Sequence, residues 1–278
     1  MPRGIPNDSR PVRAAASPAR DRAVPIPGRD PRLTRAAVRR ALRAQADPAR
    51  AVGVARFFKA GPGEYGEGDR FIGVTVPAQR AIARQFRDLP LAEADTLLMS
   101  PIHEERSTAL LILVDQFTRK RQPDDRLRER IFRLYMKRLR FINNWDLVDT
   151  SAAPIVGGWL ESAAGGSTRD GGALLERLAR SRNLWSRRVA MIATLHFIVR
   201  GDHRDAIRIA TLLVHDEHDL IHKAVGWMLR EVGKRASADA LNQFLATHAA
   251  TMPRTALRYA IERMPASERA RWMGARRV

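Results

Sequence analysis

The sequence contains no cysteine among its 278 residues. Disulfides, thiolate metal sites and cysteine nucleophiles are therefore excluded together. The one histidine-rich cluster, HDEHDLIH at residues 215–222, lacks the HExxH arrangement of a zinc site, and its acids suit a helix start. We expect polar loop and cap residues there, and we predict neither a metal nor any other cofactor.

Long apolar runs are also missing. No stretch approaches the ~20 apolar residues of a membrane span, and the first residues lack the apolar segment of a signal peptide. We therefore expect a cytoplasmic protein that has no membrane partner. The alternation typical of β-strands is nearly absent as well, apart from FIGVTV at residues 71–76.

Negative charge is scarce: 30 Asp and Glu stand against 49 Lys and Arg, which gives a formal net charge of +19 and a pI near 11.5. Residues 1–33 contain seven Arg and three Asp, so +4 lies there and +15 belongs to the rest of the chain. Such a surplus favours a polyanionic partner. The alternative is an arginine-rich proteome, in which bulk charge names no ligand.

The chain divides into two regions of different composition. Residues 1–32 combine Pro, Ala, Arg and Gly with almost no large apolar side chains, so they cannot bury enough surface to order themselves. We predict that they form a disordered arm. In residues 33–278 the apolar side chains recur with the 3.6-residue period of helices, which predicts one all-α domain.

Several predicted helices share a basic residue followed by a small, apolar face, as at Arg106, Arg188, Lys223 and Arg254. With Asn144 filling the gap after Arg106, the intervals are 38, 44, 35 and 31 residues. These intervals fit helical hairpins of the HEAT type, which stack into a solenoid. The recurring charges predict a concave basic surface suited to a duplex backbone, whereas an irregular helical bundle would lack the aligned charges.

The stretch RFINNWDLVD, residues 140–149, carries a large aromatic ring and a carboxylate on one helical stripe. Trp145 and Asp149 lie about 40° apart around a helix, and Asp146 is one step further round. An apolar core rarely accommodates such an acid. Either Asp149 is a buried, hydrogen-bonded structural group, or the pair faces a site that binds a cationic group.

A second tryptophan, Trp227, shares its helix with Lys223 and stands three residues before Arg230. An indole beside a guanidinium suits a base or sugar together with a phosphate, but a core tryptophan beside a snorkelling arginine fits the spacing equally well. The glycine-rich residues 59–74 carry three acids and lack the lysine of a P-loop. We expect a compact loop there and no nucleotide site.

Six segments, taken in order, resemble the bacterial DNA-alkylation-repair glycosylases of the AlkD-like family, which are built from HEAT-like repeats. The segments are FFKAGPGEYGEGDRFIGV, SPIHEERSTALLILV, RFINNWDLVD, LWSRRVAMIATLHF, HDEHDLIHKAVGWMLREVGK and TMPRTALRYAIERM. The resemblance covers about residues 33–271. It implies that residues 33–278 form a HEAT-like repeat DNA glycosylase domain.

The resemblance also implies catalytic residues. The family's tryptophan and catalytic aspartate, four residues apart on one helix, match Trp145 and Asp149. Its second aromatic wall matches Trp227, and the arginine three residues further on matches Arg230. Lys223 and Arg230, which share this helix, are both expected to bind DNA.

Two further family positions are ambiguous in this sequence. The family arginine on the intervening repeat corresponds to Arg188 or to its neighbour Arg187, and both are expected to bind DNA. Some members carry a tyrosine near the lesion, but the corresponding string here reads RFFK. Phe57 or Phe58 would therefore stand there without a hydroxyl group.

The activity that the resemblance implies is hydrolysis of the N-glycosidic bond of cationic alkylpurines, such as 3-methyladenine and 7-methylguanine, in double-stranded DNA. We expect a monomer that needs no cofactor and flips no base. Because the alkylated base is already cationic, the catalyst has to stabilise an oxocarbenium-like sugar, which suits Asp149, Trp145 and Trp227. The alternative is a non-catalytic HEAT-repeat protein that binds damaged or branched DNA.

Overall fold

The computed structural model describes residues 30, 32–119, 124–163 and 168–275. The chain divides into two units, Met1–Pro31 and Arg32–Val278. Residues 1–32, which the sequence predicts to be a disordered arm, lie almost entirely outside the described residues, so that prediction stays untested. The second unit contains the fold and the candidate site.

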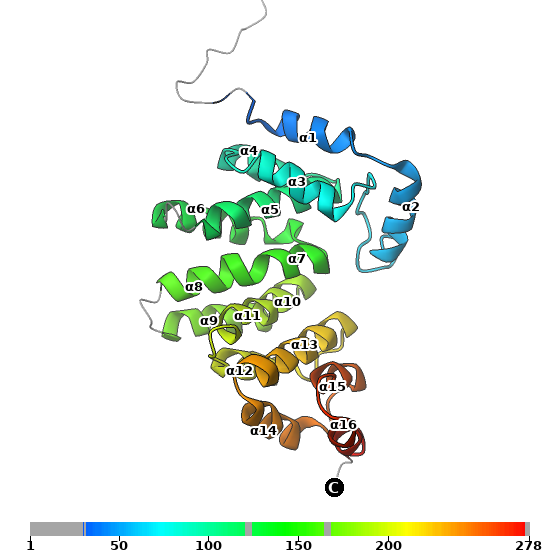
Figure 1. The fold of residues 1–278 in the computed structure, drawn as a ribbon, viewed down its shortest axis with the longest axis vertical. Helices are drawn as coiled ribbons and strands as arrows, with labels where there is room; N and C mark the ends of the chain where they lie inside the picture. Colours follow the sequence, from blue (N-terminus) through cyan, green and yellow to red (C-terminus); the bar gives the residue numbers. More distant parts are fainter. Residues whose placement is uncertain (1–29, 31, 120–123, 164–167, 276–278) are drawn as a thin grey trace, which may run out of the picture. The chain divides into compact units, whose positions relative to one another are not determined.

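The described residues of this unit fold into helices and contain no β-strand (Figure 1), which confirms the all-α prediction. The helices are α1 (Arg35–Arg43), α2 (Pro48–Phe57), α3 (Val76–Gln85), α4 (Leu91–Leu98), α5 (His103–Thr118), α6 (Asp125–Lys137), the 3₁₀ turn η1 (Leu139–Phe141), α7 (Trp145–Ser151), the π-helical segment η2 (Ala152–Gly157), α8 (Gly158–Ala163), α9 (Thr168–Ala179), α10 (Leu184–Ala193), α11 (Leu195–Ile198), α12 (Arg204–Leu213), α13 (Asp219–Arg235), α14 (Ala238–His248), α15 (Arg254–Ala260) and α16 (Ala266–Met273).

Within this unit the helices form two rows that follow the order of the chain (Figure 1). In the first row α5 packs on α7, α7 on α10, α10 on α13, and α13 on α15. In the second row α6 packs on α8, α8 on α9, and α9 on α12. Contacts such as α5 with α6, α9 with α10, and α12 with α13 join the rows. The unit is therefore a helical-repeat fold, in which each pair buries its apolar face against its neighbours.

The helix that begins at Trp145 continues through a π-helical segment. Pro154 lies within η2, and a proline has no N–H to donate and crowds the carbonyl four residues earlier. A local widening of the helix relieves both problems, and such widenings are frequent beside functional sites. The segment ends at Gly157, where a side chain would not fit because a Cβ would lie 2.5 Å from the carbonyl oxygen of Ala193.

The recurring basic residues do not form one exposed row of charges. Arg106 and Arg188 are buried, with 3% and 5% of their surfaces accessible, and both are ion-paired. Lys223 is about half exposed on its helix, and Arg254 is exposed. The predicted concave basic surface stays a prediction, but buried arginines cannot contribute to it. None of the helices in the described ranges is both long enough and apolar enough to cross a membrane.

Candidate functional site

A cleft of about 650 Å³ opens along the first row of helices. It is lined by the C-terminal end of α2, the loop of residues 59–74, and helices α7, α10, α13 and α15. The lining residues are Phe57, Lys59, Tyr65, Trp145, Asp149, Arg188, His218, Asp219, Leu220, Lys223, Trp227 and Tyr259. Six of the eight predicted site residues therefore lie on one cleft, and Arg187 and Arg230 do not.

Asp149 and Arg188 form a two-pronged ion pair across α7 and α10. Nε of Arg188 donates to Oδ1 of Asp149 at 2.8 Å, and Nη2 donates to Oδ2 at 2.7 Å. Nη1 of Arg188 donates to the carbonyl oxygen of Leu220. The carboxylate side chain is 17% exposed and the guanidinium side chain 6% exposed. Arg188 is thus placed to hold Asp149, whereas the resemblance implies that it binds DNA.

Burial raises the pKa of the Asp149 carboxyl above its ordinary value, and the hydrogen bonds and charge of Arg188 offset that rise only in part. The charge of nearby Asp146 adds to the rise. Asp149 is therefore a carboxylate with a strengthened affinity for protons at the wall of a cleft. Such a group can accept a proton from a water molecule better than an ordinary aspartate can.

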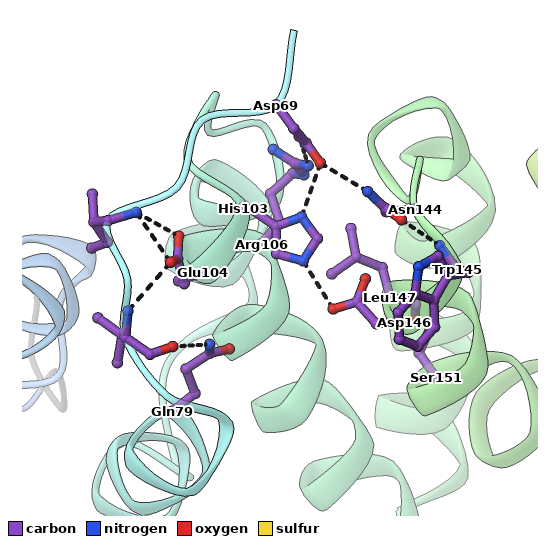
Figure 2. Close-up of polar contacts among 12 residues, drawn as sticks. Asp69, Gln79, His103, Glu104, Arg106, Asn144, Trp145, Asp146, Leu147 and Ser151 are labelled. Atoms are coloured by element: carbon purple, nitrogen blue, oxygen red, sulfur yellow. Dashed lines mark hydrogen bonds and ion pairs between the residues drawn. The ribbon is translucent and has the colours of Figure 1, made fainter. Parts of the chain in front are cut away.

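The start of α7 fixes the position of Trp145. The side chain of Asn144 accepts a hydrogen bond from the backbone N–H of Trp145 at 2.9 Å and so caps the helix (Figure 2). Phe58 stacks on the indole with the ring centres 5.2 Å apart, and Phe57 meets it edge to face at 5.8 Å. Phe57 lines the cleft and is 65% exposed, whereas Phe58 is not a lining residue and stacks on Trp145, so which of the two stands at the family's tyrosine position stays a prediction.

Tyr65 brings a hydroxyl group to the cleft, and the sequence interpretation missed it. The residue belongs to the glycine-rich loop, in which Gly66 donates to the carbonyl oxygen of Lys59 at 2.9 Å. A Cβ at Gly66 would lie 2.4 Å from the carbonyl oxygen of Phe58, so only glycine allows this approach. Burial raises the pKa of the Tyr65 phenol, and a hydrogen bond from the indole of Trp145 partly offsets that rise.

Helix α13 forms the opposite wall. His218 caps it, since its Nδ1 accepts from the backbone N–H of Leu220 at 3.1 Å, and burial holds the pKa of this histidine below its ordinary value. Lys223 reaches Oδ2 of Asp219 at 2.7 Å, in a pair whose members are 40% and 54% exposed. Trp227 follows one turn later, so α13 presents an indole and an ammonium group to the same cleft.

Arg187 and Arg230 are held away from the cleft. Arg187 donates to Asp216 at 2.6 Å and to the carbonyl oxygens of Ser181 and Arg182. Arg230 pairs with Glu262 and lies 3.4 Å from Glu231, beside a smaller cavity between α13, α14 and α15. Neither arginine was expected there, because spacing along a helix shows its face but not the acids of neighbouring helices.

The cleft therefore combines aromatic rings with the half-buried carboxylate of Asp149, the exposed carboxylate of Asp219 and two ammonium groups. The rings belong to Phe57, Tyr65, Trp145, Trp227 and Tyr259. Aromatic faces and a carboxylate stabilise positive charge, whereas ammonium groups bind phosphate. No group of three or more His, Cys, Asp or Glu side chains suited to a metal occurs in the described part of the chain.

The fold and the cleft define a helical-repeat protein with an aromatic, carboxylate-bearing groove. The model of the DNA alkylation repair enzyme family matches residues 38–264, and the chain belongs to that family. The structure of a predicted DNA alkylation repair enzyme from Enterococcus faecalis shares the fold, with a TM-score of 0.61 at 16% sequence identity. The match covers 80% of this chain and 98% of that chain. No curated protein matches the sequence.

Proposed function

We propose that this protein is a monofunctional DNA glycosylase of the AlkD-like type, built from HEAT-like repeats. Its substrates are cationic alkylated purines, such as 3-methyladenine and 7-methylguanine, in double-stranded DNA. The family supports a role in the repair of alkylated DNA. The observation that carries the finer proposal is the cleft that gathers Trp145, Asp149 and Trp227 from α7 and α13.

The chemistry follows from the charge of the substrate. The bond between C1′ and the alkylated base breaks, its electron pair neutralises the base, and positive charge develops on the sugar. Trp145 and Trp227 present π faces to that charge, and Asp149 opposes it with a full negative charge. Water then adds to C1′ and gives a proton to Asp149, whose raised pKa suits this step.

The mode of DNA binding forms part of the proposal. A monomer holds the sugar-phosphate backbone along the cleft through Lys59 and Lys223, which both line it. The damaged base stays stacked in the duplex, so the enzyme avoids the few kcal/mol that base flipping costs. Arg188 acts by holding the carboxylate and not by binding phosphate, because Asp149 and the Leu220 carbonyl occupy its donors.

A rival function is supported by the same ion pair. Because Arg188 forms two hydrogen bonds with Asp149, the carboxylate could serve only to join α7 to α10. The protein would then bind damaged or branched DNA without cleaving a bond. Incubating the purified protein with DNA treated with a simple methylating agent, followed by chromatography of the released bases, separates the two functions. We expect 3-methyladenine and 7-methylguanine well above the spontaneous background, and their absence would favour the binding protein.

A further inference from the structure

Behind the cleft wall, three buried charged side chains and the partly exposed Asp146 join the loop of residues 59–74 to α5 and α7 (Figure 2). We call them the charge cluster: Asp69, His103, Arg106 and Asp146. His103 stands in the middle, with Nδ1 2.9 Å from Oδ2 of Asp69 and Nε2 2.9 Å from Oδ2 of Asp146. Its side chain is 3% exposed. Arg106 donates to the other oxygen of Asp69.

The two carboxylates define the protonation state of His103. A neutral imidazole has one N–H and would turn a lone pair toward one of the carboxylates, whereas an imidazolium donates to both. Burial alone would lower the pKa of His103, but the hydrogen bonds and charges of Asp146 and Asp69 raise it to about 9. The charges in the cluster then balance, since His103 and Arg106 oppose two carboxylates.

The cluster links two segments that carry cleft residues. Asp69 lies in the loop that presents Tyr65, and Asp146 lies in the first turn of α7 between Trp145 and Asp149. Helix α5, which carries His103, contributes no lining residue of its own. The histidine therefore connects two walls of the cleft from behind.

A series of stacked aromatic rings connects His103 to Trp145 at the surface of the cleft. Its imidazole stacks on Phe71 with the ring centres 4.7 Å apart and lies 5.0 Å from the ring of Phe58. Phe58 in turn stacks on Trp145 at 5.2 Å. A displaced imidazole would therefore disturb the support of the indole as well as the ion pairs.

Asp146 has little else to orient it. Its Oδ1 is buried and accepts no hydrogen bond from any residue in the described ranges, so His103 sets the direction of the carboxylate. Asn144 adds a parallel connection, because its Nδ2 donates to Asp69 at 3.3 Å while its Oδ1 caps Trp145. Asn144, the cap residue of α7, is thus tied directly to the carboxylate of Asp69, and Asp146 in the first turn of α7 is tied to it through His103.

We propose that His103 is a positioning residue that fixes the loop of residues 59–74 against α7 and thereby sets the geometry of the cleft. The linkage itself does not depend on the reaction. Its effect on rate rests on the proposed glycosylase function, so the test needs one measurement with DNA and another without it.

The central variant is His103→Gln, whose amide turns an acceptor oxygen toward one of the two carboxylates. We expect single-turnover base release from methylated duplex to slow at least about tenfold, with DNA affinity within about twofold of the native value. Adding Asp146→Asn to His103→Gln restores a donor opposite that oxygen. The double variant should recover much of the lost rate, a rescue that a role limited to stability would not produce.

The matched control is Glu105→Gln. Glu105 also lies on α5, is 2% exposed in its side chain and pairs with Arg39 of α1 at 2.8 Å, but α1 contributes nothing to the cleft. This variant should lose stability and keep the native rate when all proteins are assayed well below their unfolding temperatures. Equal rate losses in His103→Gln and Glu105→Gln would overturn the proposal.

The measurements without DNA use the native protein and its variants. Amide hydrogen exchange in residues 64–70 should accelerate in His103→Gln and stay native in Glu105→Gln. Nitrogen NMR of the native protein at pH 7 should show protons on both ring nitrogens of His103, a result that needs no folded variant. A single ring proton, or unchanged loop exchange in His103→Gln, would refute the linkage. Native linkage without any base release would refute the glycosylase function alone.

Discussion

Two carboxylates of α7, Asp146 and Asp149, stand three residues apart and differ in what surrounds them. Asp146 turns one oxygen to His103, which ties it to Asp69 of the loop, although the Asp146 side chain is 22% exposed. Asp149 faces the cleft and meets one cation, Arg188. A single helix thus separates a carboxylate that holds segments together from one that is open to a ligand.

The balance between burial and nearby cations also differs between the charge cluster and the cleft. In the charge cluster, burial would raise the pKa of Asp69, but the hydrogen bond from His103 and the nearby cations bring it below its ordinary value. At the cleft, burial keeps the pKa of Asp149 raised despite its arginine. Cations therefore outweigh burial at Asp69 but not at Asp149. An incompletely compensated carboxylate is the better partner for a cation that arrives with the substrate.

The largest effect is expected from Asp149→Asn. The change removes negative charge from the place where the sugar becomes cationic, which costs roughly 3 kcal/mol in a preorganised site, or about 100-fold in rate. Single-turnover base release from methylated duplex measures it. DNA affinity should stay unchanged or improve slightly, because the carboxylate repels phosphate.

Asp219→Asn is the control for that prediction. Asp219 also lines the cleft, but it is 54% exposed and pairs with Lys223, so its removal should change the rate little. Equal losses of rate and affinity in Asp149→Asn, or loss of its folded structure, would make Asp149 a structural residue like Asp146.

The charge cluster around His103 predicts that the stability of the fold depends on pH. His103 has its pKa raised from 6.5 to about 9, and it is faced by Asp69, Asp146 and, through Asp69, Arg106. A raised histidine pKa stabilises the fold fully below pH 6.5, and that contribution is lost as the pH rises through about 9. The loss amounts to roughly 3 kcal/mol in the free energy of unfolding.

Urea unfolding at pH 6, 8 and 10 measures this contribution. The native protein should lose stability across the series beyond the change seen in His103→Gln, because the variant has no group to titrate there. Parallel curves for the two proteins would mean that His103 is neutral in the folded state, which removes the basis for the balanced charge cluster.

The sequence predicts the helices well and their partners poorly. The 3.6-residue period needs only local residues, so the all-α fold could be read directly. FIGVTV has the composition of a strand, yet the backbone N–H groups of Ile72 and Gly73 donate to the carboxylate of Glu104 at 3.0 and 2.8 Å. A side chain about 30 positions away thus accepts hydrogen bonds from amides that would pair with a neighbouring strand in a sheet. No local sequence pattern predicts this long-range contact.

The site residues show the same division. Trp145, Asp149 and Trp227 carry their chemistry in their residue types, and the fold brings them to one cleft. Arg188 appears in sequence as a surface cation, because nothing local shows that Asp149 will neutralise it 39 positions away. Tyr65 was missed because it lies in a loop without periodicity. The one available signal was an aromatic residue within a glycine-rich segment.

A smaller effect, a shift in the pH dependence of the rate, is expected when Arg188, the ion-pair partner of Asp149 in the cleft, is replaced. Its hydrogen bonds and charge lower the pKa of Asp149, so Arg188→Gln should raise that pKa further. The proposed reaction needs the ionised carboxylate, and the acidic limb of the pH–rate profile should therefore move to higher pH. Arg187→Gln should leave the limb in place, since Arg187 pairs with Asp216. A loss of rate that is uniform across the pH range would instead assign Arg188 to the packing of α7 on α10.

The smallest expected effect separates exposed cations of the cleft from buried ones. Lys223 is 40% exposed beside Trp227, so it can neutralise a phosphate, and Lys223→Gln should lower the slope of log K against log salt by about one. Arg187 is 18% exposed and committed to Asp216, so Arg187→Gln should leave the slope unchanged. Fluorescence titrations with unmodified duplex at several salt concentrations measure both. If Arg187→Gln lowered the slope and Lys223→Gln did not, the backbone would run along the outer ion pairs, and the cleft would have to contact DNA without neutralising its phosphates.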